Sequence, residues 1–284
     1  MEAYTDFAKV YDTFMDETPY KMWAGYVSGL IKEFGISETY DHGISAAQDG
    51  EEISEEMALM QERNLVVELG CGTGSFTEEM ASLGYDMIGI DMSEEMLEIA
   101  REKKEESGHE ILYLCQDMRD IDLYCTAGTF VSVCDSVNYL LEDADIVDSF
   151  KLVNNFLFPG GVFIFDFNTL HKYRDVIGDT TIAENRDDCS FIWENFFDED
   201  THINEYDLTI FAAIDDKNET FARSIETHLQ RGYTLDEMKG FVEQAGMVFV
   251  KAIDADTHKE PDENSERIYV IAREHGKKGI NDNE

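Results

Sequence analysis

The 284-residue chain is long enough for one large domain or two small ones, and its 43% hydrophobic residues suffice for a sizeable core, which excludes global disorder. Its 22 basic and 62 acidic residues give a formal net charge of −40, which repels polyanions, so we expect neither nucleic acid nor an anionic membrane surface as a partner. No apolar run approaches the ~18 residues of a membrane span, the N-terminus lacks the features of a secretion signal, and the five cysteines lack disulfide or zinc-site spacing, a combination that favours a reducing cytoplasm.

The first 63 residues divide into two parts. Apolar residues recur at helical spacing over residues 4–34 and Pro19 interrupts them, which predicts a cap of two helices over residues 1–34. Residues 35–63 are instead rich in Glu, Asp and Ser, with weak periodicity. We interpret them as an acidic insertion exposed to solvent, with one short helix at residues 54–61.

From residue 64 the chain alternates strands and helices. A short apolar run at residues 65–69 ends in a glycine-rich loop, which is typical of a buried parallel strand that turns into a helix. Ser93 is a predicted helix cap, followed by acidic residues in the first turn and by Gly108 as the stop. This alternation predicts a doubly wound α/β sheet. The further strands expected in this part lie at residues 87–90, 111–115, 129–134 and 162–167, with a helix at residues 145–158.

The pattern changes at residue 181. Residues 181–231 contain β-rich segments separated by acidic turns, which predicts long antiparallel strands inserted into the α/β unit. A capping box at Thr234 and Glu237 then begins the last helix, Gly246 ends it, and two final strands complete a seven-stranded sheet. These strands are expected at residues 189–197, 203–214 and 220–231 in the insertion, and at 247–255 and 267–272 in the sheet. The chain beyond residue 63 thus divides into an α/β core (64–180), a β-rich insertion (181–231), the end of the core (232–275) and a flexible tail (276–284).

The central chemical signal is a glycine-rich loop at residues 70–74, preceded by Glu68 and placed between a strand and a helix. Glycines let a ligand approach the backbone, and the N-terminus of a helix offers unpaired N–H groups. Asp91 lies 21 residues after Gly70, at the expected end of the second strand, where a carboxylate can accept both hydroxyls of a ribose. The loop and this acid together predict a site for a nucleotide-like cofactor.

The loop has the spacing G-x-G-x-G, whereas dinucleotide-binding proteins carry G-x-G-x-x-G. With its neighbouring motifs it resembles the class I S-adenosylmethionine-dependent methyltransferases of the small-molecule type. The resemblance implies a Rossmann-like, doubly wound, seven-stranded sheet with N-terminal helices and an inserted antiparallel segment that covers the substrate. It extends over residues 4–34 and 64–273 and rests on the motifs at residues 66–74, 89–97, 115–118, 134–140 and 158–166.

The resemblance implies S-adenosylmethionine as the cofactor and gives individual residues a role. Glu68 would order the loop, Asp91 would bind the ribose hydroxyls and Met92 would pack on the adenine. Asp117 would accept a hydrogen bond from the adenine amino group, and the N–H of Met118 would contact the ring. The full expected cofactor-binding set is Tyr11, Tyr20, Trp23, Glu68, Gly70, Cys71, Gly72, Asp91, Met92, Met96, Asp117, Met118, Asp135 and Ser136.

The acceptor is expected to be a small molecule with a nitrogen or oxygen nucleophile. Members of the superfamily that methylate DNA amino groups carry an Asn/Asp-Pro-Pro-aromatic motif where this chain has Cys-Asp-Ser-Val at residues 134–137, and the Pro-Cys pair of cytosine C5 enzymes is absent. Aromatic residues of the β-rich insertion would build the substrate pocket, although alternation along a strand does not tell whether Trp193 and Tyr206 face the same side. The expected substrate-binding residues are Tyr139, Asn168, Trp193, Tyr206 and His228.

Some roles stay open at the level of the sequence. No catalytic base is assigned, because Asp135, Asp166, His171 and His228 are all candidates, and no metal-ligand spacing occurs among the histidines. The β-rich insertion could instead pack or dimerise, so a monomer and a homodimer are both compatible with the sequence. A catalytically silent S-adenosylmethionine-binding protein is the main alternative function. An NAD-dependent oxidoreductase is less compatible, because Ser75 stands where the third glycine of its loop would be.

Overall fold

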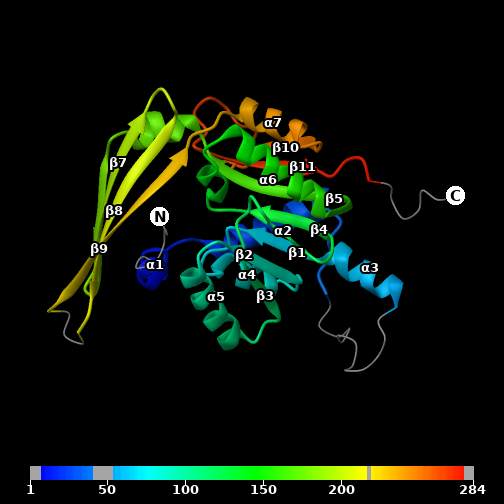
Figure 1. Ribbon diagram of the computed structural model, residues 1–284, viewed down its shortest axis with the longest axis horizontal. Coiled ribbons are helices and arrows are strands. Elements are labelled where there is room, and N and C mark those ends of the chain that lie inside the picture. Colours follow the sequence, from blue (N-terminus) through cyan, green and yellow to red (C-terminus); the bar gives the residue numbers. More distant parts are fainter. Residues whose placement is uncertain (1–7, 41–53, 216–218, 278–284) are drawn as a thin grey trace.

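A seven-stranded sheet forms the centre of the molecule (Figure 1). The computed structural model describes residues 8–40, 54–215 and 219–277. The strand order is β10-β11-β5-β4-β1-β2-β3, in which β1 to β5 are parallel and β11 is antiparallel to both of its neighbours. This confirms the Rossmann-like sheet expected from the sequence. Its strands are β1 (Val66–Leu69), β2 (Met87–Asp91), β3 (Ile111–Cys115), β4 (Ala127–Ser132), β5 (Leu157–Asn168), β10 (Val248–Asp254) and β11 (Arg267–Arg273).

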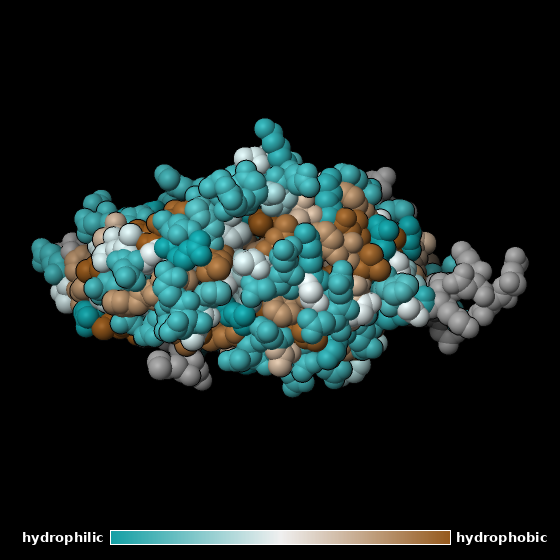
Figure 2. All heavy atoms as spheres, turned by 90° about the horizontal axis from the view of Figure 1, so that it is seen from above, coloured by the Kyte–Doolittle hydropathy of each residue, from teal (hydrophilic) through white to brown (hydrophobic). Residues whose placement is uncertain are grey.

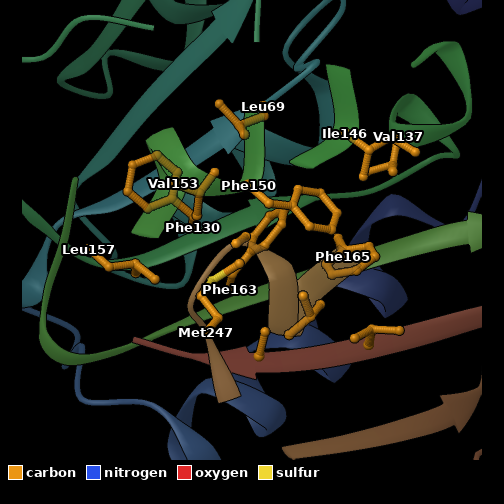
Figure 3. Close-up of a cluster of buried hydrophobic side chains, with 14 of the residues drawn as sticks. Leu69, Phe130, Val137, Ile146, Phe150, Val153, Leu157, Phe163, Phe165 and Met247 are labelled. Carbon is orange, nitrogen blue, oxygen red and sulfur yellow. The ribbon is translucent and has the colours of Figure 1, made fainter. Parts of the chain in front are cut away.

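Helices cover both faces of this sheet, so its strands are apolar on both sides. On one face Phe150 of α6 contacts Phe163 and Phe165 of β5, with ring centroids 5.2 and 5.0 Å apart (Figure 3). On the other face Met80 of α4 and Leu97 of α5 are fully buried. The helices are α1 (Ala8–Phe14), α2 (Tyr20–Phe34), α3 (Glu55–Asn64), α4 (Ser75–Ser82), α5 (Glu94–Ser107), α6 (Asp143–Phe156) and α7 (Leu235–Gln244).

A second, antiparallel sheet extends away from the core and forms the arm seen in Figure 1. It confirms the expected antiparallel insertion, but it has four strands where three were predicted. The prediction missed the edge strand β6, because this strand is short and mostly exposed. Register pairs Tyr206 with His228, and the Trp193 ring lies 5.1 Å from that of Tyr206, so these three side chains share one face. The strands are β6 (Thr181–Asn185), β7 (Cys189–Asp198), β8 (Ile203–Ala213) and β9 (Phe221–Arg231).

Some element boundaries differ from the prediction. Strand β5 begins at Leu157, five residues before the expected start, because a register shift on β4 pairs Ala127 with Leu157 and so brings the Pro-Gly-Gly segment into the strand. Because β5 begins earlier, helix α6 ends at Phe156. Its start, at Asp143, lies two residues before the expected one. A π-helix, η2 (Lys172–Ile177), follows β5 and was not predicted.

Both ends of the stretch expected to be an acidic insertion pack on the core. The Ser37 hydroxyl lies 2.8 Å from that of Thr129 on β4, and the Glu62 carboxylate accepts hydrogen bonds from the backbone and the hydroxyl of Thr126. Helix α3 confirms the short helix expected there. The middle of this stretch (41–53), the first seven residues and the tail beyond residue 277 lie outside the described residues. Figure 2 shows a surface on which hydrophilic side chains predominate, and none of the described helices is long and apolar enough to cross a membrane.

Candidate functional site

The glycine-rich loop joins β1 to α4 at the carboxyl edge of the sheet. Gly70, Gly72 and Gly74 have φ angles of +71°, +53° and +74°, a region that other residues rarely adopt. A Cβ atom on Gly70 would come within 2.6 Å of the Cβ of Ser136, so this position also needs glycine for reasons of space. The loop therefore presents bare backbone next to the residues that follow β4.

Asp91 holds this loop from the end of β2. Its carboxylate accepts a hydrogen bond from the backbone N–H of Gly72 at 2.8 Å and from that of Ser93 at 2.9 Å. Burial raises the pKa of Asp91 above its ordinary value, while these backbone hydrogen bonds act in the opposite direction. Each carboxylate oxygen can accept more than one hydrogen bond, so the group can bind ribose hydroxyls while it orders the loop.

Glu68 lies beneath the loop and is 1% exposed. The hydroxyl of Thr77 on α4 donates a hydrogen bond to it, which ties β1 to the helix that follows the loop. Burial raises the pKa of Glu68 to about 8, and the nearby charge of Asp91 acts in the same direction. At neutral pH this side chain is therefore mainly neutral. Cys71 of the loop is also buried, which raises the pKa of its thiol.

The residues expected around the adenine differ in their surroundings. Met92 is 67% exposed, whereas Met96 is 2% exposed and lies inside the protein. Met118 is half-buried and packs against the main core. The Arg119 guanidinium forms an ion pair with Asp117, which lowers the pKa of that carboxyl. Sequence reasoning missed this arginine, although its place two residues after Asp117 was a signal.

The turn after β4 is held by a buried carboxylate. Cys134 and Asp135 have positive φ angles, and both of their backbone N–H groups donate to Asp166, which is fully buried. Burial raises the pKa of Asp135 to about 6, the charge of Lys172 acts against this, and the side-chain amide of Gln230 donates to its carboxylate at 2.6 Å. This last bond links the edge of the large sheet to strand β9 of the second sheet.

Helix α1 connects the loop to the second sheet. Its Asp12 accepts a hydrogen bond from Thr73 of the loop at 2.7 Å and forms an ion pair with Lys103 of α5 at 2.7 Å. Two residues further on, the ring of Phe14 contacts that of Phe191 on β7 at 4.8 Å. No sequence signal singled out Asp12, because its partners are distant in the chain.

The three aromatic residues expected from the N-terminal segment lie close to this connection. The hydroxyls of Tyr11 and Tyr20 are hydrogen-bonded to each other, and burial raises the pKa of Tyr20. The ring of Tyr20 meets that of Trp23 edge-on at 5.7 Å, and the guanidinium of Arg267 lies 4.4 Å above the Trp23 ring. These residues are partly buried rather than core residues, so they can contact a ligand.

Four of the five expected substrate-binding residues form one cluster. The Tyr139 hydroxyl lies 2.9 Å from that of Tyr206 and 3.3 Å from Nδ1 of His228. Trp193 packs against Tyr206 in the same cluster, and its buried indole N–H meets no hydrogen-bond partner among the described residues. Asn168 makes none of these contacts: its amide contacts Tyr173 and Lys172, and its role in substrate binding remains a prediction.

Comparison with known proteins identifies the family to which this chain belongs. The family described as a methyltransferase domain matches residues 66–161. The Bacillus subtilis (strain 168) protein YqeM, which carries a methyltransferase name, is 31% identical over 273 residues, 95% of this chain and 96% of the relative. The chain belongs to the class I S-adenosylmethionine-dependent methyltransferases. A similarly named relative from Geobacillus sp. (strain WCH70) is 28% identical over 271 residues, 95% of this methyltransferase and 99% of the relative.

Solved structures share the fold of this methyltransferase. An S-adenosylmethionine-dependent methyltransferase from Clostridium acetobutylicum ATCC 824 superposes with a TM-score of 0.77 at 24% identity, covering 97% of this chain and 100% of that one. The CcbJ methyltransferase from Streptomyces caelestis gives a TM-score of 0.71 at 18% identity, covering 95% and 96%. At these identities the likeness concerns the fold.

The edge of the sheet suits the cofactor of this family. The glycine-rich loop leaves space that a side chain at Gly70 would fill, and Asp91 offers a carboxylate beside it. S-adenosylmethionine supplies a methyl group that its sulfonium already activates. No group of three or more His, Cys, Asp or Glu side chains that could hold a metal ion occurs in the described part of the methyltransferase.

Proposed function

We propose that this methyltransferase transfers the methyl group to a nitrogen or oxygen atom of a small polar molecule. The acceptor would bind between the carboxyl edge of the large sheet and the inner face of the second sheet. The observation that carries this proposal is the hydrogen bond from Gln230 of β9 to Asp135. It joins the strand that carries His228 to the turn after β4, and Ser136 of that turn contacts the cofactor loop. Apolar rings with a few polar groups are typical of small-molecule pockets.

The proposal gives the predicted cofactor residues distinct tasks. Asp91 would bind the ribose hydroxyls, and Asp117 would bind the adenine amino group in competition with Arg119. Glu68 would act beneath the loop rather than on the cofactor, because its carboxyl contacts Thr77. Correct orientation of nucleophile, methyl carbon and sulfur can lower such a barrier by roughly 7–11 kcal/mol.

Charge narrows the class of acceptor. The formal net charge of −40 disfavours nucleic acids and other polyanions, and it favours neutral or cationic molecules such as amines. Two solved structures with this fold are described as an amino pentose methyltransferase and a sugar N-methyltransferase, at 14% and 13% identity. Acceptors of that kind, which combine an amine with hydroxyl groups, are compatible with the proposed pocket.

The test is to offer the purified full chain S-adenosylmethionine with pools of amines, amino sugars and hydroxylated metabolites. Release of S-adenosylhomocysteine that depends on one pool supports the proposal. Calorimetric titration with S-adenosylmethionine and with NAD accompanies it. Binding of S-adenosylmethionine without turnover in any pool would support a silent binding protein, and preferred binding of NAD would contradict the assignment of the cofactor site.

The second sheet offers a matched pair of variants to locate the acceptor pocket. Trp193 faces the cluster, whereas its neighbour Ile192 is 37% exposed on the opposite face. We expect Trp193→Ala to lower kcat/KM for the acceptor at least tenfold and Ile192→Ala to leave it within about twofold, because only the first removes a wall of the pocket. Neither should alter the Kd of S-adenosylmethionine. A change of oligomeric state in both variants with unchanged kinetics would indicate a dimer interface instead.

A further inference from the structure

Three polar side chains occupy alternate positions of β9 and lie on its buried face. Glu226, His228 and Gln230 are 7%, 2% and 4% exposed, whereas two large apolar side chains on the opposite face, Ile225 and Leu229, are 51% and 38% exposed. This part of β9 therefore buries three polar side chains while it exposes two large apolar ones. Burying a polar group costs free energy unless a partner satisfies it, so a buried polar row points to a role beyond packing.

His228 lies between a carboxylate and a hydroxyl. Its Nε2 is 3.5 Å from Oε2 of Glu226, and its Nδ1 is 3.3 Å from the Tyr139 hydroxyl. Its ring is stacked on that of Tyr206 with centroids 4.8 Å apart, which fixes the plane of the imidazole. The charge of a carboxylate within ion-pair distance of Nε2 favours a proton on that nitrogen, and in that tautomer the lone pair of Nδ1 would face the Tyr139 hydroxyl.

Tyr139 connects His228 and Glu226 to the segment that contacts the cofactor loop. It belongs to the short 3₁₀ helix η1 (Ser136–Tyr139), which follows the turn after β4. The hydroxyl of Ser136, at the start of η1, lies 3.3 Å from the carbonyl oxygen of Gly70 in the cofactor loop. One rigid turn therefore joins the cofactor loop to the hydroxyl that contacts His228.

We propose that Tyr139, His228 and Glu226 form a proton relay that accepts the proton of the nucleophile during methyl transfer. This inference rests on the proposed function and adds the catalytic groups that the sequence left unassigned. Tyr139 is the catalytic residue that touches the acceptor, and His228 takes the proton through it. Glu226 is a positioning residue, since it sets the tautomer and stabilises the positive charge that forms on the ring.

The step balances in atoms and charge. The lone pair of the acceptor nitrogen or oxygen forms the new bond to the methyl carbon, and the electrons of the C–S bond return to sulfur. The proton of the nucleophile passes to the Tyr139 oxygen while the Tyr139 proton passes to Nδ1 of His228. After the products leave, the imidazolium beside Glu226 would return its proton through Tyr139 to the solvent in the emptied site.

Two other acidic side chains near this point, Asp135 and Asp166, hold the turn after β4 in place. The Asp135 carboxylate accepts the side-chain amide of Gln230 at 2.6 Å, which holds the two sheets together. The titratable groups in contact with His228 include Tyr139 of η1, Tyr206 of β8 and Glu226 of β9. Only Tyr139 belongs to the segment that reaches the cofactor loop, so the relay ends there.

The first test needs no acceptor. In the full chain labelled with ¹⁵N-histidine and saturated with S-adenosylhomocysteine, NMR would assign the protonation of both ring nitrogens of His228 between about pH 5 and 8. The relay requires a neutral ring with its proton on Nε2 in the upper part of this range, and Glu226→Gln should change that pattern. A proton on Nδ1, or a doubly protonated ring throughout, would overturn the proposal, because neither form can accept from Tyr139.

The second test uses the acceptor that the pool experiment selects. We expect His228→Gln and Tyr139→Phe to lower kcat roughly 10²–10⁴-fold, the usual range for general base catalysis, with the Kd of S-adenosylmethionine unchanged. His109→Gln is the matched control, because it removes another histidine–carboxylate pair, His109 with Glu78 at 2.8 Å, which lies just before the edge strand β3 of the large sheet. Full kcat in folded His228→Gln would overturn the relay and leave the methyltransferase function intact, whereas an inactive wild type that binds no S-adenosylmethionine would contradict the proposed function.

Discussion

At the scale of single residues, one carboxylate, that of Asp91, is given two tasks. Its carboxylate orders the glycine-rich loop and is the group proposed to bind the ribose. A hydrogen bond to a charged group contributes about 1.5–3 kcal/mol, and 1.4 kcal/mol is a factor of ten in affinity. We therefore expect Asp91→Ala to weaken S-adenosylmethionine binding at least tenfold in calorimetric titration. Glu110→Ala, at an exposed site before β3, serves as the control, and an equal Kd in folded Asp91→Ala would contradict the ribose role.

Glu68 couples the loop to pH through its burial. Since folding raises its pKa from 4.5 to about 8, the folded chain binds a proton that the unfolded chain releases, and stability falls as pH rises from about 4.5 to about 8. Glu68→Gln keeps an acceptor for Thr77 but removes the charge. We expect its Tm to exceed that of the wild type by a margin that grows over this window, with roughly 2–4 °C for each 1 kcal/mol. Parallel Tm curves for the two proteins would show that Glu68 does not titrate with folding.

At the scale of elements, α1 depends on its contacts because seven residues do not form a stable helix alone. Asp12 ties it to the cofactor loop, and Asp16, two residues after its end, forms an exposed ion pair with Arg186 in the turn between β6 and β7. We expect Asp12→Ala to speed dissociation of S-adenosylhomocysteine about tenfold in stopped-flow displacement, since hydrogen bonds to a carboxylate are lost. Asp16→Ala should change the rate less than threefold, because an exposed ion pair contributes about 0–1 kcal/mol. Equal rates in all three proteins would show that α1 does not restrain the ligand.

At the scale of the whole molecule, the charge of −40 opposes compaction. The face of the molecule in Figure 2 is mostly hydrophilic, and salt can screen charges that lie on such a surface. The Debye length falls from about 30 Å at 0.01 M salt to about 8 Å at 0.15 M. We therefore expect the Tm of the full chain to rise by several degrees between these NaCl concentrations, measured by calorimetry. A flat or falling Tm would indicate that the acidic residues are spaced too widely to repel one another.

The sequence by itself determined the features that depend on neighbouring residues. The strand series, the glycine-rich loop, the caps of α5 and α7 and the place of Asp91 all follow from patterns within a few residues. The antiparallel insertion could also be predicted from the sequence, because long β-rich segments separated by acidic turns are typical of antiparallel strands. Strand β6 could not be predicted, because an exposed edge strand buries few side chains and so shows no alternation of apolar and polar residues.

Only the tertiary structure decided which distant residues meet. Asp12 and Thr73 are 61 residues apart, Tyr139 and His228 are 89 apart, and Gln230 is 95 residues from Asp135. Alternation along β9 predicts that Glu226, His228 and Gln230 share a face, but it does not say which face is buried. That choice depends on the register of β9 against β8 and on the segments that cover the sheet, because a strand has the same period whichever side meets the core.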